Sequence, residues 1–352
     1  MKPIKFIIYS LLFFNFTIGL SQVSTDDLTI SNNLAPLSPN NIFKTEGYYN
    51  WGGSILKSPD GKYHLFYSRW EKKYTFSGWL THSEIAHATS DNASGPWTYV
   101  STVLKGKRKN TWDAIAAHSP KIKFFNGKYY LYYTSTNLED KNISDKELLN
   151  IATKGPNHPL WYKALRPNQR TGVAVSNSIC GSWKRMKNPL IEPSGPISTL
   201  AINPAISKGK DDKFYLIVKG DKPNEKKFIR NQAIAISDSP TGPFTIHNKP
   251  VIDYIGAEDM SIWYDETRKR FYGVFHAHTF IGLINSIDGI NWSKADDYIL
   301  MLQSLKMSNG SSLNPYSIER PFIYIENKKP KVISLAVLDH NEAYSVFIPI
   351  YE

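Results

Sequence analysis

A unit that recurs five times along the chain is the feature that most restricts its fold. The unit consists of a strand, a hairpin tip, an aromatic-rich second strand, a variable loop and a third strand, and most copies end in a Gly-Pro-Trp turn or a variant of it. The first copy reads GGSILKSPDGKYHLFYSRW and then EIAHATSDNASGPWTYV. Equivalent positions in the five copies are Tyr63, Tyr129, Phe214, Phe271 and Val332. Self-similarity of this kind indicates a repeat architecture.

The runs within each copy alternate, are rich in Tyr, Phe, Ile and Val, and are bounded by Asp-Gly, Asn-Gly or Gly-Pro turns, as in antiparallel strands. Four strands per copy predict an all-β fold, a five-bladed β-propeller. The expected blades are residues 46–105, 113–190, 200–250, 256–300 and 317–352. The last copy shows only three strands, so a strand within residues 23–42 is expected to complete it. A β-sandwich is the alternative, disfavoured because five copies match in register.

The N-terminal residues have the pattern of a targeting signal. Lys2 and Lys5 precede a mostly apolar run, Phe6–Leu20, which ends among small residues such as Ser21. We expect residues 1–21 to be a cleaved signal peptide, residues 22–352 to form one domain, and the protein to be secreted or periplasmic. No later segment approaches the roughly 20 apolar residues of a membrane-spanning helix.

The charge of the chain restricts its possible binding partners, and its cysteine content restricts how the fold can be stabilised. Cys180 is the single cysteine, which excludes an intramolecular disulfide. The formal net charge is +11, but the lysines are scattered over hairpin tips and loops, without a basic helix or clustered arginines. This distribution favours a generally basic surface; attraction to an anionic polysaccharide is the alternative, and nucleic acid is not expected as a partner.

Candidate functional residues stand where the innermost strand of each blade begins. These starts are Trp51-Gly52-Gly53-Ser54, Trp112-Asp113 followed by His118, Asn203-Pro204, Glu258-Asp259 and Glu319-Arg320-Pro321. In a propeller the starts converge on the central channel, where a carboxylate without solvent or a partner is costly. A ring of carboxylates there is explained more easily by function than by folding.

The same face receives the ends of the second strands and the starts of the third strands. These contribute Arg69, Glu84, His276 and His278. The loops that join second to third strands also vary most in length there, and residues 136–170 form the longest. Function usually lies on variable loops carried by a rigid scaffold, so this face is the expected site.

The five repeats, with acidic or Asn-Pro motifs at their starts and Ser-Asp…Gly-Pro-Trp turns, resemble the five-bladed glycoside hydrolases of family 43, family 117 and the invertase-like clan. The resemblance spans about residues 46–350. It implies that acidic residues on successive innermost strands act as base, pKa modulator and acid. The chain departs from family 43 in the first blade, where Gly52 and Gly53 stand in place of an aspartate. It therefore resembles a divergent member.

Glycoside cleavage needs one carboxylic acid to protonate the leaving oxygen and a second carboxylate to activate water or attack carbon. The resemblance favours Glu258 as the acid and Asp113 as the base, with Asp259 the alternative to either. Because neighbours on a strand point to opposite faces, only one of Glu258 and Asp259 is expected to line the channel. Glu319 is a further catalytic candidate. Structural roles stay open: a loop cap for Asp113, a hydrogen bond for Glu258, and an ion pair between Glu319 and Arg320.

Eight further residues are candidates for holding sugar. They are Trp51, Arg69, Glu84, Trp112, His118, Asn203, His278 and Arg320. Aromatic rings suit the apolar face of a sugar, although core packing is an equal alternative for each tryptophan, and Glu84 is equally well read as a strand-edge carboxylate or a third acid. Histidines on separate strands have no metal-ligand spacing, so no metal or other cofactor is assigned; a channel-bound divalent cation is an open alternative.

Three functions remain open at this stage. The favoured one is an inverting, exo-acting glycoside hydrolase on plant or algal cell-wall oligosaccharides. The second is a retaining glycosidase of the invertase-like kind. The third, supported by the missing first-blade aspartate, is a carbohydrate-binding propeller without catalysis. In each case the partner is an oligosaccharide or polysaccharide, neutral or anionic.

Overall fold

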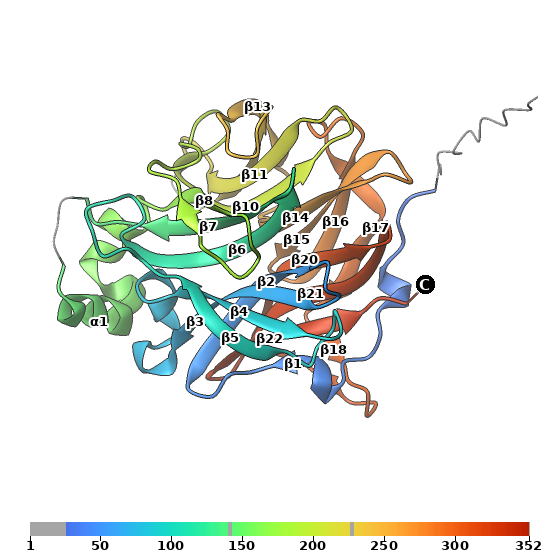
Figure 1. Cartoon of the computed structure of the whole chain (residues 1–352), viewed down its shortest axis with the longest axis horizontal. Helices are drawn as coiled ribbons and strands as arrows, with labels where there is room; N and C mark the ends of the chain where they lie inside the picture. The colour runs from blue at the N-terminus through green and yellow to red at the C-terminus, as the bar shows by residue number, and fades with distance from the viewer. Residues whose placement is uncertain (1–25, 140–142, 226–228, 352) are drawn as a thin grey trace, which may run out of the picture.

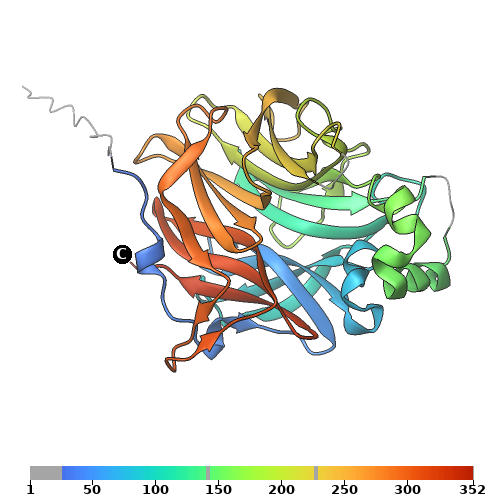
Figure 2. The same ribbon diagram turned by 180° about the vertical axis from the view of Figure 1, so that it is seen from behind.

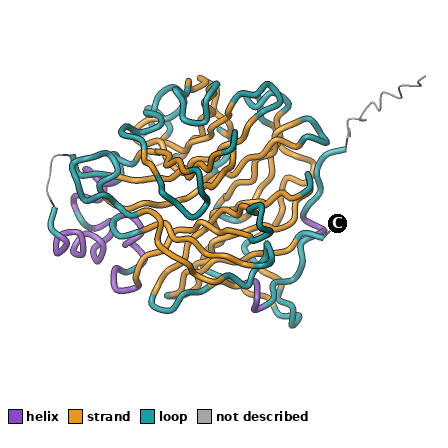
Figure 3. The backbone as a smooth tube through the Cα atoms, viewed as in Figure 1, coloured by secondary structure: helices purple, strands orange, loops and turns teal. Residues whose placement is uncertain are grey.

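The computed structural model describes residues 26–139, 143–225 and 229–351, and it is built almost entirely of strands (Figure 3). The predicted signal peptide, residues 1–21, lies outside the described residues. The all-β class predicted from the repeats is confirmed. No helix among the described residues has the length and hydropathy needed to cross a bilayer.

Each of the first two sequence repeats folds as an antiparallel sheet. The first sheet contains β2 (Tyr48–Lys57), β3 (Tyr63–Glu71), β4 (Glu84–Ser90) and β5 (Thr98–Leu104). The second contains β6 (Ile115–Phe125), β7 (Lys128–Thr136) and β8 (Arg170–Ser176), with the short β9 (Lys184–Arg185) on β8. In both, sequence order is spatial order, as the short hairpin connections require.

The next two repeats repeat this pattern. The third sheet contains β10 (Ser198–Lys208), β11 (Phe214–Asp221), β12 (Arg230–Ser237) and β13 (Thr245–Ile252). The fourth contains β14 (Glu258–Asp265), β15 (Arg270–Ala277), β16 (Phe280–Ser286) and β17 (Ser293–Leu302). A parallel contact between Ala201 and Arg170 connects the second and third sheets.

The fifth sheet joins the two ends of the described chain. It contains β20 (Ser317–Glu326), β21 (Lys329–Asp339), β22 (Glu342–Pro349) and β1 (Ile42–Phe43). Strand β1 pairs with β22 through Ile42 opposite Val346 and Phe43 opposite Ser345. A small hairpin, β18 (Leu305–Lys306) with β19 (Ser312–Leu313), precedes β20.

The first strands of the five sheets meet at the centre of the molecule (Figure 1). Contacts run from β2 to β6, then to β10, β14, β20 and back to β2, so the five strands form a closed ring. The later strands of each sheet lie further out, and the view from behind shows the same arrangement (Figure 2). The starts of the first strands therefore converge on one place, although they are far apart in sequence.

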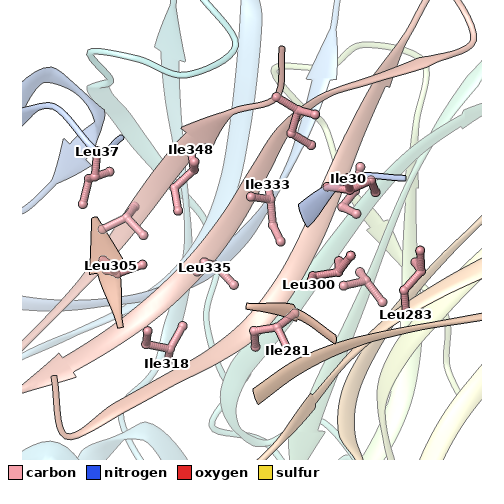
Figure 4. Packing of buried hydrophobic residues seen from close by; sticks show 14 of the residues in the cluster. Ile30, Leu37, Ile281, Leu283, Leu300, Leu305, Ile318, Ile333, Leu335 and Ile348 are labelled. Atoms are coloured by element: carbon pink, nitrogen blue, oxygen red, sulfur yellow. The ribbon is translucent and has the colours of Figure 1, made fainter. Parts of the chain in front are cut away.

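The sheets pack through apolar side chains on alternate strand positions. Figure 4 shows the cluster between the fourth and fifth sheets, where Ile281 and Leu283 approach Ile333 and Leu335. The N-terminal segment seals this cluster, because Ile30 and Leu37 are wholly buried in it. Burying side chains of this kind contributes about 1.5–3 kcal/mol each, so the segment before β1 is part of the folded domain.

The long connection between β7 and β8 is here called the insert, residues 137–169. It contains α1 (Asp145–Lys154), a 3-10 turn (Gly155–Asn157) and a π-helical turn (Trp161–Leu165), and lies at one side of the molecule (Figure 1). The Ser144 hydroxyl caps α1 by accepting from the Glu147 amide. Leu148 and Ile151 are fully buried against Trp161, which fixes the insert to the body.

Candidate active site

A β-bulge interrupts each of the five first strands near its start. The pairing register shifts just after Trp51 in β2, His118 in β6, Ile202 in β10, Glu258 in β14 and Glu319 in β20. The next residue has a positive φ in every case: Gly52, Ser119, Asn203, Asp259 and Arg320. A bulge bends the strand and redirects its side chains, so two consecutive residues of each strand reach the central site.

This bulge corrects one prediction. We expected Glu258 and Asp259 to point to opposite faces, so that only one would line the channel. The positive φ of Asp259, 57°, breaks the alternation. Both carboxylates reach Lys219, Glu258 from the cavity lining and Asp259 from the lining of the narrow channel beside it, so they do not point to opposite faces. Aspartate tolerates this left-handed conformation better than most residues.

The residues that follow the bulges form a ring around the channel. The Ser119 hydroxyl donates to Asn203 Oδ1 (2.9 Å), and the Asn203 amide donates to Asp259. Arg320 Nε lies 3.1 Å from Asp259 Oδ2, and its Nη1 donates to Ser119 Oγ (2.7 Å). The space enclosed, ≈ 10 Å³, is about that of one water molecule.

Gly52 completes the ring by leaving room for Arg320. A Cβ at Gly52 would lie 3.0 Å from the Arg320 Cβ, and the φ of Gly52 is +64°. The arginine side chain thus occupies the space where the first sheet would otherwise present a side chain. An aspartate at position 52 would therefore meet the Arg320 side chain.

A cavity of ≈ 390 Å³ opens beside the ring. All five sheets contribute to its lining, and the insert supplies a further wall. The lining residues are Trp51, Phe76, Trp79, His118, Pro156, Trp161, Tyr162, Arg166, Ile202, Asn203, Lys219, Arg230, Glu258, Glu319 and Arg320. Aromatic rings and charged groups in one concave site are typical of ligand-binding cavities.

Lys219, on β11, controls two of the carboxylates. Its buried ammonium contacts Glu258 Oε2 and lies 3.1 Å from Asp259 Oδ1. Burial raises the pKa of Glu258, but the charge and hydrogen bond of Lys219, together with the charge of Arg230, hold that pKa below the ordinary value. Burial likewise acts on Asp259, where Arg320 and Lys219 together hold the pKa well below the ordinary range. Both groups are therefore carboxylates near neutral pH.

Glu319 behaves in the opposite way. Burial raises the pKa of its carboxyl group, and the negative charges of Asp259 and Glu258 raise it further against the opposing effects of His276 and Arg320. Glu319 therefore keeps its proton to higher pH than an ordinary glutamate. Two carboxyl groups lining one cavity thus differ in the direction of their pKa shift.

The channel also brings together one group with metal-binding chemistry. Ligand atoms of Asp259, His276 and Glu319 all lie within 4.8 Å of one another. The Asp259 carboxylate is already ion-paired with Lys219 and Arg320, and two cations beside a site repel a third. We therefore name no metal ligands among these side chains.

Seven of the predicted residues meet at this site. They are Trp51, His118, Asn203, Glu258, Asp259, Glu319 and Arg320. The His118 side chain is held by the Ser83 hydroxyl at 2.8 Å, and burial lowers its pKa well below the usual value. His118 therefore enters the cavity as a neutral imidazole.

The structure does not bring Asp113 to this cavity. Its carboxylate is fully buried, accepts from the Thr111 hydroxyl (2.9 Å) and the Tyr133 hydroxyl (3.0 Å), and pairs with Arg185 (3.2 Å) and Lys107 (3.3 Å). Four partners leave it no access to a ligand in the cavity. This geometry fits the structural alternative, an anchor for the loop before β6.

Four predicted sugar-binding residues also lie outside the cavity lining. Arg69 and Glu84 form a buried ion pair (2.8 Å), and the Thr102 hydroxyl also donates to Glu84. The Trp112 ring packs over Gly172, where an added Cβ would lie 2.2 Å from it. His278 is exposed at the end of β15. These four side chains are packed within the protein or exposed at its surface, and none of them faces the cavity.

Sequence reasoning missed three cations of the cavity. Lys219 sits inside an otherwise apolar strand, FYLIVKGD, and a lone lysine in such a run was the available signal. Arg230 begins β12 and Arg166 follows the π-helical turn of the insert. No local pattern distinguished these arginines from surface residues.

Comparisons with known proteins agree with this geometry. The model of the family "Glycosyl hydrolases family 43" matches residues 97–238. The probable arabinan endo-1,5-alpha-L-arabinosidase A of Aspergillus clavatus is 30% identical over 125 residues, which are 35% of this chain and 33% of that protein. The match thus spans about a third of the curated relative's length.

Solved structures of low sequence identity share the fold. A family 117 glycoside hydrolase of the marine bacterium Zobellia galactanivorans is 17% identical, with a TM-score of 0.61 over 90% of this chain and 88% of that chain. An endo-arabinase of Bacteroides thetaiotaomicron is 14% identical, with a TM-score of 0.55 over 86% and 95%. The resemblance to family 43 and family 117 glycoside hydrolases, predicted from the repeats, is confirmed.

Proposed function

We propose that this protein is a glycoside hydrolase built on a five-bladed β-propeller, with the five sheets as blades and the cavity beside their central ring as active site. The closed contact ring of the five first strands supports this blade count. The family 43 match and the neighbours' fold support the class.

The observation that carries the proposal is the opposite pKa shift of two glutamates lining one cavity. Glu319, with its raised pKa, suits the general acid, which must hold a proton to give to the leaving oxygen. Glu258, kept ionised by Lys219, suits the base that activates water. This assignment replaces Glu258 as acid and Asp113 as base.

Two ring residues, Asp259 and Arg320, and the neighbouring Lys219 keep these two glutamates in position. Asp259 pairs with Arg320, which is the neighbour of Glu319 in sequence, and with Lys219, which also contacts Glu258. Arg320 has a positive φ of 56°, a strained conformation for arginine that its bonds to Ser119 and Asp259 hold in place. We assign Asp259, Arg320 and Lys219 to positioning the two glutamates.

An inverting, exo-acting reaction on plant or algal oligosaccharides fits this site best. The cavity is closed below by the ring, whose channel admits no more than about one water, so a sugar chain enters by its end. The Aspergillus clavatus relative is named as a probable arabinan endo-1,5-alpha-L-arabinosidase, which makes arabinan the first substrate to test, with the endo or exo mode read from its products. Export through residues 1–21 remains part of the proposal, because polymeric substrates lie outside the cell.

The test is product release from arabinan, xylan, agar and ulvan fragments by wild type, Glu319→Gln and Glu258→Gln. General acid–base catalysis contributes about 10²–10⁴-fold, so each variant should lose rate by that factor. Glu84→Gln, a buried carboxylate outside the cavity, is the matched control and should retain the rate of the folded enzyme. Full activity in both cavity variants would contradict the assignment.

A carbohydrate-binding protein without catalysis is the second candidate. It is favoured by Gly52, which stands where family 43 enzymes have an aspartate, and by the fact that Arg320 fills the space above it. If wild type binds oligosaccharides from the panel but releases no product from any, this second candidate is correct and the first is not.

A further inference from the structure

We propose that the oligosaccharide recognised in this cavity carries an anionic group, a carboxylate or a sulfate ester, and that Arg166 with Arg230 binds it. The inference rests on the proposed function only in placing a sugar in the cavity; it concerns which sugar.

The first observation is the charge of the lining. Four of the residues that line the cavity have basic side chains, Arg166, Lys219, Arg230 and Arg320, whereas two carry carboxyl groups, Glu258 and Glu319. Basic side chains therefore outnumber carboxyl groups in the lining by two. A cavity for a neutral sugar needs hydrogen-bond donors and acceptors, not an excess of positive charge.

The second observation is the pairing of these cations. Lys219 pairs with Glu258 and Asp259, Arg320 with Asp259, and Arg230 with Asp221 at the end of β11. Arg166 differs: within residues 26–139, 143–225 and 229–351, it has no carboxylate in ion-pair contact. Its Nη1 donates to the neutral Gln169 amide oxygen at 2.8 Å.

The third observation is that Arg166 is held in a fixed position. Gln169, its hydrogen-bond partner, is 2% exposed, and the Arg166 guanidinium lies 5.5 Å from the centroid of the Trp79 ring. The amide of Arg166 donates to the Trp161 carbonyl (2.9 Å), which fixes the backbone at the end of the π-helical turn. A side chain that is ordered in this way needs little further ordering when a ligand binds.

The electrostatic environment of Arg166 indicates that an anionic partner is missing beside it. Burial and the neighbouring charge of Arg230 lower the pKa of its guanidinium to about 10, against the opposing effect of Glu258. A partly buried cation without an anionic partner is costly. An anion placed between Arg166 and Arg230 would offset the repulsion between the two guanidinium groups.

The chemistry of guanidinium limits the kind of ligand. Its planar fork of N–H donors matches carboxylate and sulfate oxygens in a two-point contact. Tyr162, exposed on the same turn of the insert, lines the cavity as well and offers a ring face to the pyranose or furanose that carries the anion. A uronic acid residue and a sulfated sugar both satisfy this description.

The test is isothermal titration of wild type, Arg166→Gln and Lys163→Gln with three probes: trigalacturonate, galactotriose and a sulfated galactotriose. Lys163, exposed on the same turn, is the matched control for loss of one positive charge. Wild type and Lys163→Gln should bind a charged probe at least ten-fold more tightly than galactotriose, and more weakly as salt rises. Arg166→Gln should bind all three with similar affinity. A preference for trigalacturonate alone or for the sulfated probe alone identifies the anion.

Equal affinity of wild type for charged and neutral probes would overturn the inference, as would a preference that Arg166→Gln retains. Binding needs no hydrolysis, so the two proposals fail separately. Charge preference without product release from any substrate contradicts the glycosidase proposal only. Cleavage of neutral arabinan without any charge preference contradicts the anion site only.

Discussion

Glu258 and Glu319 line the same cavity, and Lys219 contacts the first of them but not the second. This difference in contacts separates their pKa shifts, since burial by itself would raise both. The pair can therefore divide the roles of base and acid, and several consequences can be measured.

The pH dependence of the turnover should have a basic limb set by Glu319. Its protonated form is the active one, so the rate should fall as pH rises through its raised pKa and should hold below that value. Glu319→Gln should be slow and nearly independent of pH on that side. A pH–rate profile measured with a substrate whose leaving group needs no protonation is the control, because the limb should then disappear. An unchanged limb in Glu319→Gln would assign it to another group.

Asp259→Asn should destabilise the protein by about 3–5 kcal/mol, because it leaves Lys219 and Arg320 buried without their shared carboxylate. The folded-state pKa of Asp259 is depressed, so its contribution is present above the ordinary value of 3.8 and declines as pH falls through the folded pKa. The stability gap between wild type and variant in urea unfolding should therefore narrow in acid. A gap below about 1 kcal/mol at pH 7 would contradict the role given to the ring.

Asp113→Asn should separate stability from catalysis. The variant weakens the contacts with Tyr133, Arg185 and Lys107, so the unfolding temperature should drop markedly. The turnover of the folded fraction should stay within a few-fold of wild type, because the side chain does not line the cavity. A hundred-fold loss of turnover with unchanged thermal stability would restore Asp113 as the catalytic base.

Gly52→Ala should cost more than Gly47→Ala, although both glycines have similar positive φ, +64° and +74°. Each substitution places a side chain in the left-handed region at a cost of about 1–2 kcal/mol. Only at position 52 would the new Cβ also crowd Arg320, at 3.0 Å. Chemical denaturation should show the larger loss for Gly52→Ala, together with weakened substrate binding. Equal losses would mean that Arg320 moves aside freely.

Acidification should destabilise the protein through its buried histidine pair. His64 Nδ1 lies 2.8 Å from His87 Nε2, and burial lowers the pKa of His87 to about 4. An unfolded histidine titrates near 6.5, so the unfolded state binds the proton first and stability falls between that pH and about 4. His87 alone should contribute about 3 kcal/mol to this fall. His87→Leu should flatten the urea-derived stability curve by that amount; an identical curve would show that the pair protonates without unfolding.

The repeat pattern predicted the strands well because each has local signals: alternation, aromatic content and turn residues. The same pattern placed Glu319, Arg320 and Asn203 at the site, since equivalent positions in a repeat occupy equivalent places. It failed for the pair Glu258 and Asp259, because strand alternation assumes regular pairing and each first strand contains a bulge.

Other parts of the site depend on contacts between distant segments. Lys219 belongs to the site because β11 passes beside β14, and Arg166 belongs to it because the insert packs over the first sheet. Asp113 looked equivalent to the other strand-start acids, but it precedes the bulge of its strand by several residues and faces Tyr133 and Arg185. Position relative to the bulge decides which acid reaches the channel, and sequence periodicity does not reveal it.

The insert leaves and rejoins the second sheet through neighbouring paired strands, with Ser135 opposite Arg170. The two ends of the insert are already held together by the sheet, so its length and composition can change at small entropic cost. It carries Trp161, Tyr162 and Arg166, while the two glutamates proposed as base and acid stand on β14 and β20. If the proposed roles hold, ligand choice and bond cleavage are encoded in separate stretches of the gene, and an insert transplanted from a relative should change the polysaccharide that is bound without altering the proposed acid and base.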